Sequence, residues 1–166
     1  MKSIILAALL AVLAPAAAQA EIAAPTGKVI LSVTGAIENK NAGDAAQFDM
    51  QMLENLGGRE AAMQTPWTEG NTSFKGPLLR NILKAAGAHG TKLHIIALND
   101  YAAELPIEDA EKIDTILATE MNGKPMSVRD KGPLFLIYPF DTNPELYNEK
   151  YFSRSVWQIK AIEVVN

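Results

Sequence analysis

Short apolar runs separated by turn residues dominate the sequence after residue 28. Residues 29–33, 93–98, 134–138 and 156–165 are rich in β-branched or aromatic side chains, and each has the length of a strand. Residues 134–138 are apolar at every position, so we expect this strand to lie at the centre of a sheet. In the last run the apolar phase changes around Lys160, which predicts a β-bulge there.

One segment has clear helical spacing. Leu and Ile residues recur at helical intervals after Pro77, which suits the first turn of a helix, and Gly87 suits its end. Asp49 can cap a second, shorter helix. Asn122 and Gly123, between two extended segments, predict a hairpin with a type I′ turn. The pattern as a whole predicts an α+β fold, with a strand-rich mixed sheet core and a few helices.

The first twenty residues have the pattern of a secretory signal peptide. Lys2 gives a positive start, residues 4–13 are apolar, and an Ala-x-Ala motif ends at Ala20, so cleavage is expected after Ala20. The segment lacks an Arg-Arg pair, which indicates the Sec route rather than the twin-arginine route. We therefore expect residues 21–166 to work as a single domain in the bacterial periplasm, without a membrane anchor.

Composition excludes several classes of function. The chain has no cysteine, which excludes disulfides, thiolate nucleophiles and thiolate metal ligands. Without Lys2 it has 14 basic and 19 acidic residues, and this negative balance argues against nucleic acid as a partner. His89 and His94 are too few for a zinc site without carboxylates, so we interpret both as structural. The sequence has neither a Gly-x-Ser-x-Gly elbow nor a glycine-rich phosphate loop.

Four segments, in order, resemble motifs of the molybdopterin-binding domain of the sulfite-oxidase-like oxidoreductases. Residues 72–87 resemble the family's "W/F-x-G-x-x-L … LL … AG" element, and residues 99–106 are similar to its "DGY … lP" turn. Residues 117–125 look like "LA … NG-x-P-L", and residues 132–139 with 157–159 resemble "G-x-P-x-R-L-v-x-P … W … I". The resemblance covers most of the chain and implies a sulfite-oxidase-like, mostly-β core with a few helices.

The chain departs from the family where the chemistry is expected. In that family a cysteine thiolate binds molybdenum, and this sequence has none. The arginine of the "P-x-R" strand, which helps to hold the anionic pterin, is replaced by Phe135. Exported molybdoenzymes are typically loaded in the cytoplasm and leave folded, whereas a Sec substrate crosses unfolded. We therefore expect no cofactor, with molybdopterin as the alternative.

Arg129, Lys131 and Arg154 lie in two turns and could converge on a small anion, because guanidinium groups suit oxyanions. The alternative is that Asp130 and Glu149 pair with these basic residues and that the neighbouring aromatic residues belong to the core or its rim. In the first interpretation, aromatic and turn residues complete the ligand-binding set: Trp67, Asn99, Asp100, Tyr101 and Tyr138.

Three functions remain open. The first is a non-catalytic periplasmic protein that keeps the family's fold and binds a small anionic ligand or a partner protein. The second is a molybdopterin-dependent oxidoreductase with an oxygen ligand to the metal, such as Asp100 or a threonine hydroxyl in residues 65–72. The third is an interaction module that docks another chain through the aromatic-rich segment 138–157.

Overall fold

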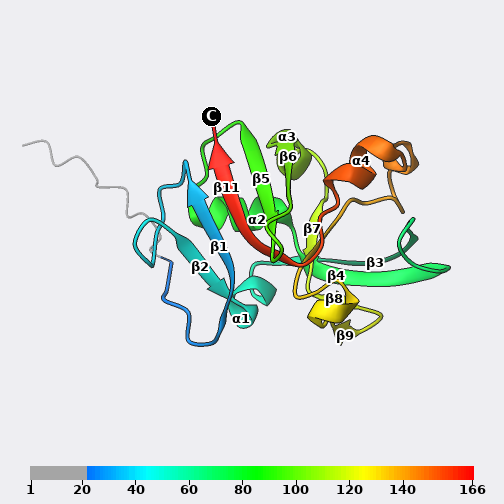
Figure 1. Ribbon diagram of the computed structural model, residues 1–166, viewed down its shortest axis with the longest axis horizontal. Coiled ribbons are helices and arrows are strands. Elements are labelled where there is room, and N and C mark those ends of the chain that lie inside the picture. Colours follow the sequence, from blue (N-terminus) through cyan, green and yellow to red (C-terminus); the bar gives the residue numbers. More distant parts are fainter. Residues whose placement is uncertain (1–21) are drawn as a thin grey trace, which may run out of the picture.

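A computed structural model describes residues 22–166, so the predicted signal peptide lies outside the described residues. Five strands drawn from both ends of this part of the chain form the larger sheet, in the order β2-β1-β11-β5-β6 (Figure 1). β1 and β11 are parallel, and the other neighbours are antiparallel. The bounds are β1 Val29–Gly35, β2 Ala46–Asp49, β5 Lys92–Ala97, β6 Ala102–Pro106 and β11 Ile159–Val165.

One face of this sheet is buried and the other faces solvent. Alternate residues along β1, β5 and β11, such as Leu31, Leu93 and Ile162, are fully buried. They share one hydrophobic core with the apolar side chains of α2 (Leu79–Ala86), which lies behind the sheet in Figure 1. The strand residues between them are half-exposed, as the two-residue period of a one-sided sheet requires.

The helix predicted after Pro77 is confirmed, with a different start. Pro77 is the last residue of β4 (Asn71–Pro77), where it pairs with Gly58, and Leu78 is the residue that precedes the helix. The helix ends at Gly87, whose φ of 64° lies in the left-handed region that glycine adopts without strain. The shorter helix α1 (Met50–Glu54) begins as predicted, because the Asp49 carboxylate accepts a hydrogen bond from the Met52 N–H at 2.9 Å.

A second sheet extends to one side of the first, in the order β3-β4-β8-β9 (Figure 1). It consists of β3 (Gly58–Gln64), β4, β8 (Glu120–Met121) and β9 (Lys124–Pro125). Asn122 and Gly123 join β8 to β9 with φ values of 50° and 72°. Two successive positive φ values are those of a type I′ turn, so the predicted hairpin is confirmed.

The strand predicted at the centre of a sheet has a different environment. β10 (Phe135–Ile137) pairs with one strand, β7 (Ile116–Ala118), and on its other edge it makes only a bridge between Phe135 and Trp157. Its three residues are nevertheless fully buried within the common core. A continuous apolar run indicates that both faces are covered. Around Phe135 this cover comes from Phe74 of β4 and from two loop residues, Trp67 and Trp157.

The bulge predicted near Lys160 is confirmed, because the pairing of β11 with β5 shifts between Ile159 and Ala161. β11 begins three residues later than expected, since Trp157 bridges to β10 and Gln158 has a φ of 55°. The remaining short helices are α3 (Glu108–Glu111), α4 (Glu149–Arg154) and the 3₁₀ turns η1 (Val128–Asp130) and η2 (Pro144–Leu146). No helix in residues 22–166 is long and apolar enough to span a membrane.

Candidate functional site

A cavity of about 500 Å³ opens between α4, the turn joining β5 to β6, and the chain entering β11. We call it the aromatic pocket, because four of its lining residues are aromatic. Its size lies in the range typical of small-molecule sites. The lining residues are Trp67, Ala97, Asn99, Tyr101, Glu149, Phe152, Ser153, Ser155, Val156, Trp157 and Gln158.

Aromatic packing holds the rings of the pocket in place. The ring centroid of Trp67, in the loop between β3 and β4, lies 5.7 Å from that of Phe152 and 6.3 Å from that of Trp157. The ring planes of Phe152 and Trp157 are inclined to that of Trp67 by 81° and 65°. Phe135 lies beneath them, 5.4 Å from Trp67 and 5.9 Å from Trp157, and is fully buried. These contacts fix the rings before any ligand arrives.

The polar lining is mostly neutral. The Ser153 and Ser155 hydroxyls donate to backbone carbonyls of α4, and the Gln158 amide donates to the Val128 carbonyl. The Asn99 side-chain oxygen accepts a hydrogen bond from the N–H of Tyr101, a residue that is 54% exposed. Glu149 is the single charged residue of the lining, at the exposed first turn of α4.

The structure brings together part of the predicted site. Trp67 comes from the loop between β3 and β4, Asn99 and Tyr101 come from the turn between β5 and β6, and all three line the same pocket. Lys131 approaches it indirectly, with its Nζ 4.9 Å from the centroid of the Trp157 ring. Arg129 lies on the exposed turn η1, outside the lining.

Asp100 lies beside the pocket but is engaged elsewhere. Its carboxylate accepts a hydrogen bond from the Lys160 ammonium at 2.6 Å, and this bond lowers the pKa of Asp100 below its ordinary value. The residue is exposed and has a φ of 66°, as the turn before β6 requires. The negative charge of Asp100 is therefore neutralised by Lys160 of the same chain.

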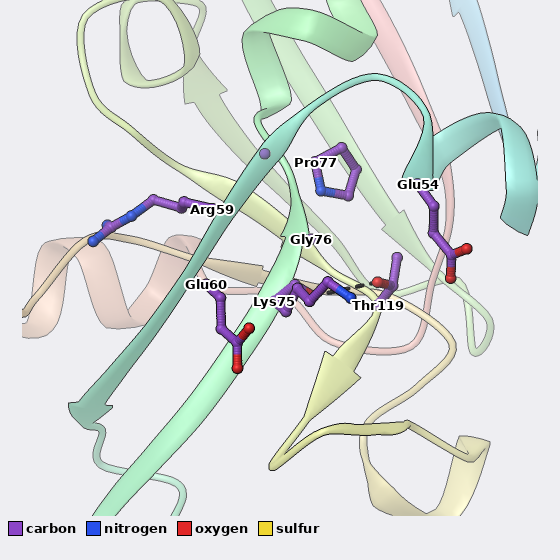
Figure 2. A pocket seen from close by; sticks show the side chains of 8 residues that line it. Glu54, Arg59, Glu60, Lys75, Gly76, Pro77 and Thr119 are labelled. Atoms are coloured by element: carbon purple, nitrogen blue, oxygen red, sulfur yellow. Dashed lines mark hydrogen bonds between the residues drawn. The ribbon is translucent and has the colours of Figure 1, made fainter.

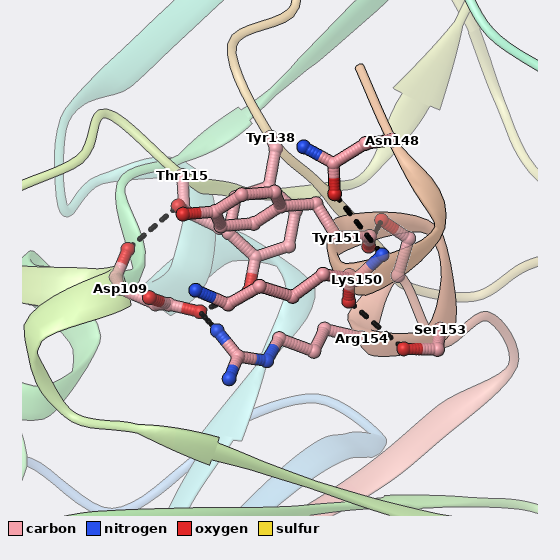
Figure 3. A network of polar contacts seen from close by, with 9 residues as sticks. Asp109, Thr115, Tyr138, Asn148, Lys150, Tyr151, Ser153 and Arg154 are labelled. Carbon is pink, nitrogen blue, oxygen red and sulfur yellow. Dashed lines mark hydrogen bonds and ion pairs between the residues drawn. The ribbon is translucent and has the colours of Figure 1, made fainter. Parts of the chain in front are cut away.

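Tyr138 and Arg154 do not line the pocket; they belong to a buried polar network (Figure 3). The Tyr138 hydroxyl and the Arg154 Nη1 both donate to Oδ2 of Asp109 at 2.7 Å, and Thr115 donates to the Asp109 carbonyl. Burial raises the pKa of Tyr138 far above its ordinary value, and the hydrogen bond to Asp109 adds to this rise. The network attaches α4 to α3.

The expected convergence of Arg129, Lys131 and Arg154 on one anion is thus not formed, because Asp109 neutralises Arg154. The alternative partners were also wrong. Arg154 pairs with Asp109 and not with Glu149, and the Asp130 carboxylate accepts from the Ser127 hydroxyl. Asp109 lies in no motif and on a weak helical segment, so the sequence offered no signal for it.

A smaller cavity of about 260 Å³ lies where β3 and β4 approach the end of β7 (Figure 2). Its two cations are already paired: Arg59 with Asp141, and Lys75 with Glu120 at 3.0 Å. The hydrogen bond that the Lys75 ammonium donates to the Glu120 carboxylate raises the pKa of Lys75. Figure 2 shows the Arg59 side chain extending away from the other labelled residues, among which Glu54, Glu60 and Lys75 are charged.

His94 lies on the solvent-facing side of the larger sheet, between two carboxylates on neighbouring strands. Its Nδ1 is 3.1 Å from Glu163 and its Nε2 is 3.2 Å from Glu104. Hydrogen bonding to Glu163, and next to Glu104, raises the pKa of His94 above 6.5. Among residues 22–166 no group of three or more His, Asp or Glu side chains is arranged to hold a metal ion.

The charged form of His94 is therefore expected to stabilise the fold. Because the folded-state pKa is raised, the contribution is complete below the unfolded value of about 6.5 and is lost as the pH rises through the folded value. Urea unfolding should show a larger difference between the parent protein and His94→Gln at pH 5.5 than at pH 8.5. His89→Gln removes a histidine that contacts a backbone carbonyl and is the matched control. Equal differences at both pH values would contradict this prediction.

The residues do not fit the metal chemistry that the resemblance implies. The chain has no thiolate donor, and the position of the expected arginine is Phe135, buried beneath the two tryptophans. Several of the alternative oxygen ligands are engaged within the chain. Asp100 pairs with Lys160, and the Thr65 hydroxyl shares a 2.8 Å hydrogen bond with Thr68. Neither a thiolate nor the expected arginine is therefore present to hold molybdopterin.

Comparison with solved structures shows which known fold this chain resembles. The sulfane dehydrogenase SoxCD from Paracoccus pantotrophus superposes with a TM-score of 0.60 at 17% sequence identity. The superposition covers 81% of this chain and 37% of that one, so this chain spans little more than a third of its length. None of the curated proteins matches the sequence significantly.

Residues 38–166 match the family model described as "Oxidoreductase molybdopterin binding domain". This match agrees with the structural similarity and with the strand-rich α+β fold. The chain therefore belongs to the family of oxidoreductase molybdopterin binding domains.

Proposed function

We propose that this protein is an exported, non-catalytic member of its family, which binds a small ligand or a partner protein in the aromatic pocket. The observation that carries the proposal is the different role of one residue position in this chain. Phe135 stands where the resemblance places a pterin-holding arginine, and its ring supports Trp67 and Trp157. At the position where the family motif has an arginine that binds the cofactor, this chain has a phenylalanine that supports the aromatic pocket.

The half-exposed rings of the pocket support a binding role. Trp157 is 38% exposed, although burying a tryptophan in the core is the more favourable arrangement. Large aromatic side chains held at an accessible cavity are typical of recognition sites. Trp157→Ala should also cost less stability than the loss of a buried tryptophan, so it is a usable binding variant.

The lining favours a ligand other than a simple anion, because its one charged residue is Glu149. Binding of an anion by Arg129 and Lys131 remains a prediction. Neither residue has a carboxylate partner among residues 22–166. The second candidate function, a molybdopterin-dependent oxidoreductase, is favoured by the family alone.

The deciding experiment is to express the precursor in a bacterium that makes molybdenum cofactor and to purify the protein from the periplasm. Elemental mass spectrometry and released-pterin fluorescence should find neither molybdenum nor pterin. A cysteine-containing family member produced in the same host is the positive control. Stoichiometric molybdenum and pterin would overturn the non-catalytic proposal.

Export is tested on the same sample. Intact-mass analysis should give a chain that begins at Glu21, as cleavage after Ala20 requires. A full-length chain retained in the cytoplasm would contradict the predicted signal peptide and the periplasmic location.

A further inference from the structure

We propose that the aromatic pocket recognises an organic cation, such as a quaternary ammonium or guanidinium group. This inference rests on the proposed binding function and names the ligand's chemistry. The cation could belong to a small molecule or to a basic side chain of a partner protein. In both cases the same aromatic surfaces and carboxylate would recognise it.

The arrangement of rings suits a cation. Trp67, Phe152 and Trp157 line one cavity, and the ring planes of Phe152 and Trp157 are inclined to that of Trp67 by 81° and 65°. The face of an aromatic ring carries negative charge density and attracts cations, tryptophan most strongly. Several ring faces around one site are the usual device for binding alkylammonium groups, which make few hydrogen bonds.

The charges around the pocket point to the same chemistry. Glu149 is exposed, and it has no hydrogen-bond or ion-pair partner among residues 22–166. The nearby cations are engaged outside the lining: Lys160 with Asp100, and Lys150 with the Tyr151 ring at 5.0 Å. A carboxylate left without a partner beside neutral aromatic walls attracts a cation and repels an anion.

Trp157 already binds an ammonium group within the chain. The Lys131 Nζ lies 4.9 Å from the centroid of this ring, within the range of a cation–π contact. Lys131 is outside the pocket lining, so the contact leaves the cavity itself without a basic residue. The remaining lining can serve the polar tail of a ligand, through the amides of Asn99 and Gln158.

The chain contains two tryptophans, and both line the pocket. Intrinsic tryptophan fluorescence therefore reports on this site alone. We would titrate the purified mature protein with choline chloride, with N-acetyl-arginine amide, and with 3,3-dimethylbutanol, a neutral molecule of nearly the same shape as choline. Sodium chloride keeps the ionic strength constant. Saturable fluorescence changes are expected for a cation, with affinity at least about tenfold above that of the neutral alcohol.

Two variants distinguish recognition of a cation from binding of an apolar ligand, and both variants retain the two tryptophans that report binding. Glu149→Gln removes the exposed charge and should weaken cation binding up to about fivefold, as for an exposed ion pair. Phe152→Leu removes one ring face and should weaken it about tenfold. Glu111→Gln removes the same charge from exposed α3, outside the pocket lining, and should leave binding unchanged. Thermal unfolding followed by circular dichroism confirms that each variant is folded.

Saturation with choline assigns the site to a small organic cation, and saturation with N-acetyl-arginine amide alone assigns it to a partner's basic side chain. Equal affinity for choline and 3,3-dimethylbutanol, or an unchanged cation affinity in Glu149→Gln and Phe152→Leu, would overturn the inference. Binding of the neutral alcohol would still support the proposed binding function. Failure of all three probes to bind would also overturn the inference, whereas molybdenum and pterin analysis tests the proposed function separately.

Discussion

Asp109→Ala is expected to lower the free energy of unfolding by about 3–5 kcal/mol, the usual cost of breaking a buried ion pair from one side. The substitution leaves the largely buried Arg154 guanidinium without its carboxylate and the Tyr138 hydroxyl without an acceptor. Urea unfolding followed by circular dichroism measures the loss. The same change frees the C-terminal end of α4, so its amide protons should exchange faster.

Tyr138→Phe and Glu108→Ala are the controls. Tyr138→Phe removes one hydrogen bond and keeps the ring in place, so the expected loss is about 1 kcal/mol. Glu108 is an exposed neighbour of Asp109, and its replacement should change stability by less than about 0.5 kcal/mol. A loss below that of Tyr138→Phe in the Asp109→Ala variant would show that the network does not hold α4.

Phe135→Ala should cost about 3–5 kcal/mol, because it removes a fully buried ring that contacts three other aromatic residues. Phe135→Arg, which introduces the residue expected from the family motif, should destabilise the protein still more. It would place an uncompensated charge among Trp67, Phe74 and Trp157.

Phe135→Leu is the matched control, since it keeps an apolar side chain and loses only part of the volume. It should unfold at a denaturant concentration between those of the parent protein and Phe135→Ala. If Phe135→Arg proved as stable as the parent protein, the position would tolerate a cation. Such a result would contradict the proposed role of Phe135 as a hydrophobic support in place of the pterin-binding arginine.

Local signals in the sequence were sufficient to predict several elements of the fold. The helix over residues 79–86 follows from its apolar spacing and Gly87, and the β8–β9 hairpin follows from Asn122 and Gly123. The bulge in β11 follows from a change of apolar phase. Each of these depends on contacts close in sequence, where side-chain chemistry and backbone geometry are directly linked.

Features that depend on distant contacts could not be predicted in the same way. The apolar run of β10 indicated burial correctly but could not indicate how many strands lie beside it. Helix α4 has little apolar periodicity of its own, and it is placed by the ion pair with Asp109 and by ring contacts of Phe152. Such elements form because the rest of the fold stabilises them.

The same distinction applies to the site. Trp67, Asn99 and Tyr101 line one pocket, as their predicted grouping requires, and their role in binding a ligand remains a prediction. Arg154 was assigned to an anion because its true partner, Asp109, is distant in sequence. Charge on a side chain can be read from the sequence, but whether another residue already neutralises that charge depends on the tertiary fold.

The position of β11 in the sheet constrains the order in which the protein can fold. β11 is the last strand along the chain, yet it lies between β1 and β5, and β1 has no other partner on that side. A chain that emerges with its N-terminus first can form the β3–β4 and β5–β6 hairpins early, but the larger sheet stays in two pieces until β11 is free. Such pairing over long sequence separations is slow. Closure of the larger sheet around β11 is therefore expected to be the slow step of folding, after both hairpins have formed.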